Sequence, residues 1–230
     1  MSIADRLSSV RARIDDAARR AGRDPSSVRL VAVSKTFPVD AVREAFAAGQ
    51  RDFGENRVQE ALEKIGGCSD LDIRWHLLGH LQTNKARKAA PAFAMIQSVD
   101  SVDLLQKLDG AAAEAGNTPE LLIQVDLAGE ETKYGAAPDQ VPAILEAAEQ
   151  ARAARVVGLM TLPPIPEVPE DARPWFRRLG EWREQWLAAG VPSQRLREVS
   201  MGMSGDFEIA IEEGATIVRV GTAIFGSRSA

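Results

Sequence analysis

Eight short runs rich in apolar and β-branched residues alternate with segments of helical periodicity along this 230-residue chain. The strand-like runs cover residues 28–35, 52–56, 73–79, 93–99, 120–127, 155–160, 198–203 and 216–221. Helical patterns cover residues 38–49, 101–115, 138–153, 171–189 and 206–213. Alternation of this kind predicts parallel βαβ units, and eight of them close into a (β/α)8 TIM barrel of the α/β class. The doubly wound open sheet is the alternative, but residues 34–38 lack the Gly-rich dinucleotide turn of that fold.

The segment before the first strand has the pattern of an extra N-terminal helix, about residues 2–21. Apolar residues recur on one face of it, and a glycine follows as a stop: Ile3, Leu7, Val10, Ile14 and Gly22. The chain ends a few residues after the eighth strand-like run, which leaves no room for an eighth helix there. We therefore expect the N-terminal helix to cover the seam between strands eight and one of a single domain, residues 1–230, whose barrel spans about 28–226.

Composition excludes several classes of protein. The net charge of −5 and the pI near 5.3 argue against a nucleic-acid binder, which usually has a basic surface. No apolar stretch is long enough to span a bilayer, so no membrane partner is expected. The single cysteine, Cys68, cannot form an intramolecular disulfide and fits a cytoplasmic protein. Two histidines and one cysteine make a structural zinc site improbable.

The first strand ends in a lysine. Val31, Val33 and Lys35 share one parity, and side chains of one parity face the interior of a barrel. We therefore place Lys35 inside the barrel, at the C-terminal mouth where barrel active sites lie. A lysine there can condense with a carbonyl to form a Schiff base. The alternative is a lysine that extends to solvent from the end of the strand.

Two turns of small residues follow the last two strands. The run Ser200–Asp206 leads from a strand into a helix through two glycines and two hydroxyls, and Gly221 and Thr222 follow the eighth strand. Barrels often bind phosphate with the loops after strands seven and eight, where helix N-termini present free N–H groups. We predict a phosphate site here. The alternative is plain N-capping of the following helix by Ser204.

Three further polar residues lie close to these features. Arg219 stands in an otherwise apolar strand and needs a partner, for which a surface ion pair is the alternative explanation. Asn56 follows the second strand and can therefore reach a ligand held on Lys35. His76 has no Cys or carboxylate at metal-ligand spacing, and such a histidine is more often a core residue than a catalyst.

A Schiff-base lysine together with phosphate turns describes a site for pyridoxal 5′-phosphate. Five segments closely resemble the pyridoxal phosphate homeostasis protein family: residues 31–36, 54–56, 75–85, 200–204 and 219–226. The resemblance runs from about Val28 to Gly226. The fold of that family is similar to the N-terminal barrel domain of alanine racemase, in agreement with the eight strands counted above.

The resemblance also implies roles for individual residues. Lys35 would carry the cofactor as a Schiff base, Arg219 would approach the pyridine nitrogen, and Asn56 would lie near the ring. The phosphate would be surrounded by Ser200, Ser204, Gly221 and Thr222. His76 and Met201 would line the pocket. Many members have a second lysine two positions after the first, whereas this chain has Phe37 there, which puts a cofactor hand-over role for that position in doubt.

Three functions remain open from the sequence. The resemblance implies a protein that binds and buffers pyridoxal phosphate, and delivers it to apoenzymes, without turning over a substrate. Nothing in the sequence demands a dimer, so we expect a monomer. The alternative is a racemase-like enzyme, which needs a second base; alanine racemases take it from a tyrosine in an additional C-terminal domain. That domain is expected to be absent because the chain stops soon after Gly226, and nothing in the sequence suggests a catalytic role for the only tyrosine, Tyr134. A third possibility is a Schiff-base aldolase whose phosphate turns bind a sugar phosphate.

Overall fold

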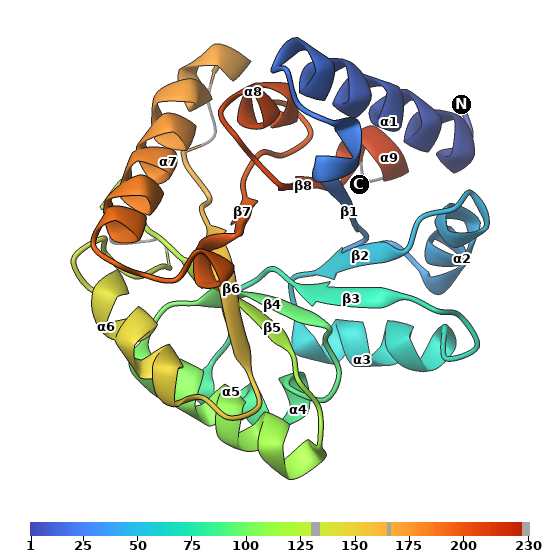
Figure 1. Cartoon of the computed structure of the whole chain (residues 1–230). Coiled ribbons are helices and arrows are strands. Elements are labelled where there is room, and N and C mark those ends of the chain that lie inside the picture. The colour runs from blue at the N-terminus through green and yellow to red at the C-terminus, as the bar shows by residue number, and fades with distance from the viewer. Residues whose placement is uncertain (130–133, 165–166, 227–230) are drawn as a thin grey trace.

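The computed structural model describes residues 1–129, 134–164 and 167–226. Eight parallel strands follow one another in sequence order around a closed barrel (Figure 1), which confirms the predicted (β/α)8 fold. The strands are β1 (Arg29–Val33), β2 (Asp52–Glu55), β3 (Arg74–Leu77), β4 (Met95–Val99), β5 (Glu120–Gln124), β6 (Arg155–Met160), β7 (Glu198–Ser200) and β8 (Ile217–Val220). Each lies within one of the eight strand-like runs, so all eight were predicted correctly.

Helices form the outer ring. They are α1 (Ile3–Arg20), α2 (Val39–Ala47), α3 (Val58–Gly67), α4 (Ala86–Ala89), α5 (Val102–Ala115), α6 (Val141–Ala147), α7 (Arg173–Ala188), α8 (Phe207–Glu212) and α9 (Thr222–Phe225). Short 3₁₀ helices lie at Pro25–Ser27, Thr83–Lys85, Ala148–Gln150, Pro169–Ala172 and Ser193–Leu196. The pattern over residues 138–153 predicted too long a helix, because the α-helix stops at Ala147. No helical pattern was assigned to α3 or α4.

The N-terminal helix lies where the eighth helix of a regular barrel would be. In Figure 1, α1 runs beside α8, α9 and α2, next to β8 and β1. Arg13 forms a 2.8 Å ion pair with Glu208 of α8, and the Ile3 amide donates to Glu44 of α2. The predicted covering of the seam is therefore confirmed. The expectation that no helix follows the eighth strand is wrong, since the one-turn helix α9 does so.

The barrel wall separates two apolar layers. Inside it, a small cluster fills the interior: Val31, Met95, Leu122, Val157, Met160 and Ile217. Outside it, a larger layer packs the strands against the helices and includes Leu30 and Ala32. Since neighbours along β1 face opposite layers, Val31 points inward as the parity argument predicts.

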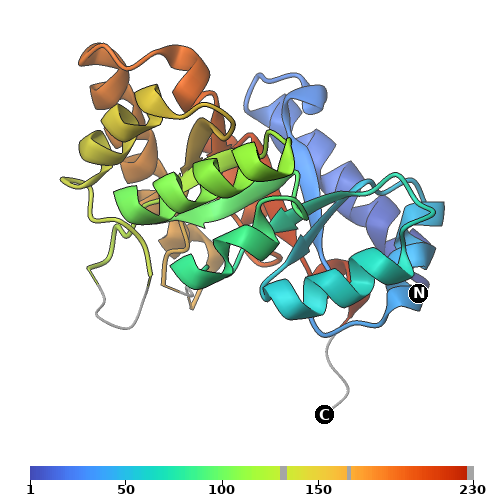
Figure 2. The ribbon, with the colours of Figure 1, turned by 90° about the horizontal axis from the view of Figure 1, so that it is seen from below.

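The carboxyl ends of the parallel strands meet on one side of the barrel. In Figure 2 the loops after β5 and β6 and the helix α9 lie along the same lower edge of the molecule. Gly79 on this side packs so tightly that an added Cβ would lie 2.1 Å from the carbonyl oxygen of Asn56. Only glycine allows this close approach of the loop after β3 to the loop after β2.

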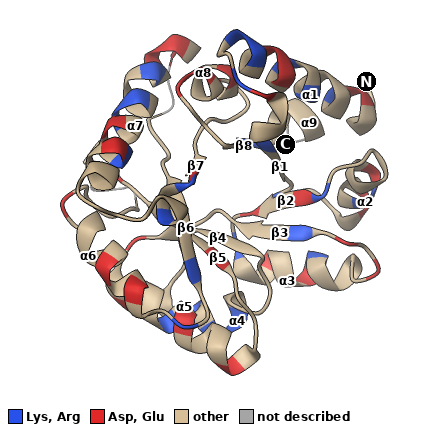
Figure 3. Cartoon of the chain, in the orientation of Figure 1, with Lys and Arg blue, Asp and Glu red and all other residues tan. Residues whose placement is uncertain are grey.

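The outer helices carry charges of both signs. Figure 3 shows basic and acidic residues interspersed along α1 and α7. Among the helices in the described part of the chain, none combines the length and the apolar character needed to cross a bilayer.

Candidate functional site

A cavity of about 630 Å³ opens at the carboxyl ends of the strands, and every strand except β4 contributes to its walls, either directly or through the loop that follows it. Six of the residues predicted for the site line this cavity: Lys35, Asn56, Ser204, Arg219, Gly221 and Thr222. They are up to 187 positions apart in the sequence, between residues 35 and 222. The closed barrel brings them together because all of them follow, or end, a strand.

Arg219 lies at the buried end of the cavity. It is 3% exposed, and its guanidinium donates to the hydroxyl of Ser200 at 2.5 Å and to the carbonyl of Thr161 at 2.9 Å. Its partners are therefore neutral oxygens, and the alternative of a surface ion pair is wrong. Burial lowers the pKa of Arg219 to about 10, against a weaker opposing effect of Asp206. The guanidinium is still charged at neutral pH.

A chain of hydrogen bonds continues from Arg219 through the barrel interior. The Ser200 hydroxyl donates to Gln97 Oε1 at 2.6 Å, and Gln97 Nε2 donates to His76 Nδ1 at 3.1 Å. All three side chains are buried. This assignment of the histidine tautomer follows from the hydrogen-bond partners. The Ser200 hydroxyl thus donates its proton to Gln97 and accepts a hydrogen bond from Arg219.

The other end of this chain of hydrogen bonds lies where β2 and β3 begin, at the amino-terminal end of the barrel. His76 Nε2 donates to Asp52 at 2.9 Å, and Arg74 donates to the other oxygen of Asp52 at 2.6 Å. Burial lowers the pKa of His76, and Asp52 only partly opposes this effect, so the imidazole is neutral at neutral pH. We call the six residues from Arg219 to Arg74 the interior chain.

Three residues predicted for the site do not line the cavity. Ser200 and His76 lie beneath it as links of the interior chain. Met201 is fully buried in the outer apolar layer, because it follows Ser200 in the chain and so faces the opposite side of the barrel wall. The place in the pocket that the resemblance implied for Met201 is therefore not the one it has in this structure.

The two phosphate turns contact each other. Ser204 Oγ accepts hydrogen bonds from the amides of Gly221, at 3.2 Å, and Ala223, at 3.4 Å, at the start of α9. Ser204 therefore joins the loop after β7 to the loop after β8, and α8 has no side-chain cap from it. Gly202 has a φ of +87°, and a Cβ there would lie 2.5 Å from that of Ala210. The loop after β7 thus requires glycine at this position.

Among the cavity residues that were not predicted, His80, Gln124 and Tyr134 have polar side chains. The ring of Tyr134 stacks on that of His80, with centroids 3.7 Å apart, and Gln124 donates to the Tyr134 carbonyl. His80 Nδ1 lies 3.3 Å from a carboxylate oxygen of Asp100. These residues could have been proposed from the sequence because they lie at or after the ends of β3 and β5. The sequence offered no pattern that pairs them.

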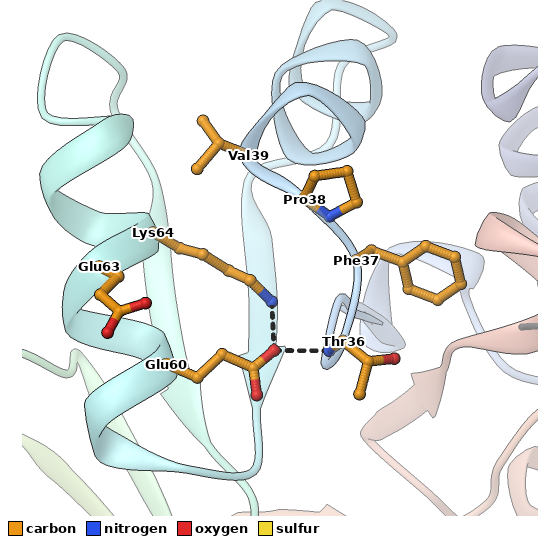
Figure 4. Close-up of a pocket in the computed structure, with 7 residues that line it drawn as sticks. All are labelled: Thr36, Phe37, Pro38, Val39, Glu60, Glu63 and Lys64. Carbon is orange, nitrogen blue, oxygen red and sulfur yellow. Dashed lines mark hydrogen bonds and ion pairs between the residues drawn. The ribbon is translucent and has the colours of Figure 1, made fainter.

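A second, smaller cavity of about 360 Å³ lies beside the loop between β1 and α2 (Figure 4). Its walls are formed by residues 36–39 and by α3 residues such as Glu60, Glu63 and Lys64. Phe37 packs against Phe225 with ring centroids 5.1 Å apart. In the described part of the chain, no group of three His, Cys, Asp or Glu side chains could hold a metal ion.

Comparison with known proteins gives the family. The family model for the N-terminal domain of alanine racemase matches residues 6–229. The pyridoxal phosphate homeostasis protein of Aquifex aeolicus is 43% identical over 228 residues, covering 99% of each chain. That of Pseudomonas aeruginosa is 46% identical, covering 99% of this chain and 96% of its own.

The chain belongs to the pyridoxal phosphate homeostasis protein family. A solved relative, PipY of Synechococcus elongatus with pyridoxal phosphate bound, is 44% identical and superposes with a TM-score of 0.86 over 98% of this chain and all of that one. An alanine racemase of Clostridium difficile shares the fold, with a TM-score of 0.74 at 16% identity, and this chain spans 58% of its length. The expected likeness to the N-terminal barrel of alanine racemase is confirmed.

Proposed function

We propose that this chain binds pyridoxal phosphate, holds it as a Schiff base on Lys35, and serves pyridoxal phosphate homeostasis without turning over a substrate. The observation that carries the proposal is one cavity lined by both a primary amine and a buried guanidinium, Lys35 and Arg219. The names of the relatives and the ligand of PipY support it. We extend the proposal to a monomer in the cytoplasm that passes the cofactor to apoenzymes.

The residues of the cavity fit this cofactor. When bound, pyridoxal phosphate supplies an aldehyde, which condenses with a primary amine and releases water. Lys35 provides the amine, and Arg219 provides N–H donors for the ring nitrogen. Ser204 and Thr222 provide hydroxyl groups for the phosphate, and Gly221, whose amide donates to Ser204 Oγ, lies between them in the same wall of the cavity. Asn56 lines the same cavity and would lie near the ring.

The charge state of Arg219 is a modest argument for a carrier over an enzyme, because the racemase resemblance includes a similar arginine. With a pKa of about 10, its guanidinium keeps its protons at neutral pH. A positively charged donor beside the ring nitrogen disfavours protonation of that nitrogen, and an unprotonated ring is a weaker electron sink. The same residue therefore holds the cofactor and reduces its reactivity toward amino acids.

The racemase-like alternative has one observation in its favour. Tyr134 stands at the edge of the cavity, 58% exposed and stacked on His80. An assay of alanine and other amino acids for racemization decides between the two functions. Robust turnover that is lost in Tyr134→Phe would support the enzyme, and no turnover supports the carrier.

Colour tests the binding step. Protein that has been mixed with pyridoxal phosphate and then freed of unbound cofactor is expected to retain a visible absorbance band, because the linked cofactor is a conjugated imine. The band should be absent in Lys35→Ala and present in Lys88→Ala, which changes an exposed lysine on α4. A protein that is colourless after this treatment would refute the proposal.

A further inference from the structure

Three charged side chains pack behind the loop that carries Lys35, and the proposed function leaves them without a role. Glu55 ends β2 and is fully buried, whereas Glu60 and Lys64 lie one turn apart on α3. Lys64 is only 5% exposed. We call Glu55, Glu60 and Lys64 the clamp. Lysine and glutamate are almost never fully buried unless they are paired.

The Lys64 ammonium uses all of its donors in this cluster. It donates to Glu55 Oε1 at 2.7 Å, to Glu60 Oε1 at 2.8 Å and to the backbone carbonyl of Ser34 at 2.7 Å. An ammonium group has three N–H donors, so none is left for another partner. Figure 4 shows the Lys64 ammonium against Glu60 on α3, and Glu60 in turn bound to Thr36 in the loop between β1 and α2.

The clamp holds the residues on both sides of Lys35. Ser34 is bound twice, through its carbonyl to Lys64 and through its hydroxyl to Glu55 at 2.6 Å. The amide of Thr36 donates to Glu60 at 2.5 Å. The residue between them is therefore fixed at its two neighbours, and its side chain lines the large cavity while Thr36 lines the small one.

Thr36 has an unfavourable backbone conformation. Its φ is +68°, and no other non-glycine residue in the described ranges has a positive φ. A β-branched residue in this region is strained, and such strain persists only where the surroundings impose it. The hydrogen bond from the Thr36 amide to Glu60 holds the backbone of Thr36 in this conformation.

The electrostatics of the clamp do not suit a purely stabilising role. Burial raises the pKa of Glu55, and its Oε2 has no hydrogen-bond partner among the described residues. In Glu60 burial also acts to raise the pKa, but hydrogen bonds from Lys64 and Thr36 outweigh it and lower the pKa overall. Buried ion pairs often stabilise a fold no better than apolar side chains of similar volume. The ion pairs of the clamp therefore matter here for the geometry that they give to the loop between β1 and α2.

We propose that Glu60 and Lys64, together with Glu55, are positioning residues: they set the turn at Ser34–Thr36 and thereby direct the Lys35 amine into the large cavity. This inference rests on the proposed function, since the reaction it serves is the condensation of that amine with pyridoxal phosphate. It adds residues that contact Ser34 and Thr36, on either side of Lys35.

The test compares Glu60→Ala with Glu60→Gln and with a matched control, Glu63→Ala. Glu63 lies on the same helix and lines the same small cavity, but its side chain accepts only from Gln59 in the contacts of the described residues. Amide hydrogen exchange is measured first, on the ligand-free proteins. Exchange at Thr36 should be about tenfold faster in Glu60→Ala. It should stay near the wild-type rate in Glu60→Gln, which keeps an oxygen acceptor, and in Glu63→Ala.

The second measurement uses pyridoxal phosphate itself. The rate at which the visible absorbance develops should fall about tenfold in Glu60→Ala and recover in Glu60→Gln, and the pH midpoint of that absorbance should move only in Glu60→Ala. Thermal unfolding confirms that each variant is folded. Unchanged exchange at Thr36 would overturn the inference, and so would faster exchange with wild-type cofactor kinetics.

Failure of the proposed function gives a different result. Wild-type protein that develops no absorbance at all refutes the proposed function, and with it the inference that the clamp serves condensation. The exchange data then still show, independently of any cofactor, whether Glu60 holds the turn at Thr36.

Discussion

Lys35 and Arg219, two of the groups assigned to the cofactor, are each supported by a buried polar network, and the two networks are built differently. The interior chain behind Arg219 runs through the barrel, with neutral side chains in its middle and charges only at its ends. The clamp behind Lys35 lies outside the barrel wall and places two carboxylates and one backbone carbonyl around a single ammonium. The interior chain is held together by several hydrogen bonds between different side chains, whereas all contacts of the clamp to its cation go to a single ammonium group.

This difference has a consequence for mutation. Loss of one link in the interior chain leaves two neutral or singly charged groups short of a hydrogen bond. Loss of Lys64 leaves two carboxylates, one of them fully buried, without a counter-charge. We therefore expect the clamp to be the more fragile support of the fold, and the interior chain to act mainly on Arg219.

The largest effect is expected for Lys64→Met. It keeps the length of the side chain but removes the ammonium, so the free energy of unfolding should fall by about 3–5 kcal/mol, as for other broken buried ion pairs. Urea unfolding followed by circular dichroism measures this change. Lys88→Met, on the exposed surface of α4, is the control. A loss no greater than that of the control would contradict the clamp's dependence on its cation.

Arg219→Ala should come next. It removes the buried guanidinium from the cavity, and hydrogen bonds to charged groups contribute about 1.5–3 kcal/mol, which corresponds to roughly 10- to 100-fold weaker binding of pyridoxal phosphate. Equilibrium dialysis measures the affinity. Arg87→Ala is the control because that side chain is 79% exposed on α4. Equal affinity in the two variants would remove Arg219 from the ligand contacts.

A smaller effect is expected for Ser200→Ala. The variant leaves a donor of Arg219 and the acceptor Oε1 of Gln97 without a partner, at a cost of about 1–3 kcal/mol in unfolding free energy. Affinity for pyridoxal phosphate should fall as well, although less than in Arg219→Ala. Ser9→Ala on the exposed face of α1 serves as control. Lost stability with unchanged affinity would show that the interior chain does not position Arg219.

The smallest effect is a pH dependence that separates the two networks. Burial holds the pKa of His76 below 6.5, so the unfolded chain takes up a proton that the folded protein does not, and stability decreases as pH falls below 6.5. Glu55 acts in the opposite direction. Burial raises its pKa above 4.5 in the folded state. Ionisation of Glu55 therefore lowers the stability of the fold as pH rises from 4.5, and protonation of Glu55 restores that stability as pH falls.

Unfolding experiments between pH 7 and 5 measure these contributions. In His76→Gln the loss of stability on acidification should be smaller than in the wild type, whatever the absolute stability of the variant. In Glu55→Gln the loss should be larger, because the compensating proton uptake is removed. Identical pH slopes in all three proteins would rule out both titrations as contributors.

The strands and the inward direction of Lys35 could be predicted because they depend on local alternation. Val31, Val33 and Lys35 share a parity, and the barrel preserves it. The same rule excludes Met201 once Ser200 faces inward. Helix α3 was missed because a lysine, Lys64, lies on its buried face, and a lysine is normally expected on the exposed one.

The partners of the site residues could not be predicted. Ser200 bonds to Gln97, 103 positions away, and its hydroxyl at a strand end suggested a phosphate ligand instead. Glu55 and Lys64 meet Ser34 only because β1 and β2 are neighbours and α3 packs behind them. Spacing along the sequence contains no information on contacts that depend on the closure of the barrel.

The most direct test of the account is mass spectrometry of the protein after addition of pyridoxal phosphate, reduction with borohydride and digestion. Reduction converts an imine into a stable amine, so the peptide that held the cofactor retains its mass. The account predicts the modification at Lys35 and at none of the other five lysines. Modification of another lysine instead, or of none, would contradict it.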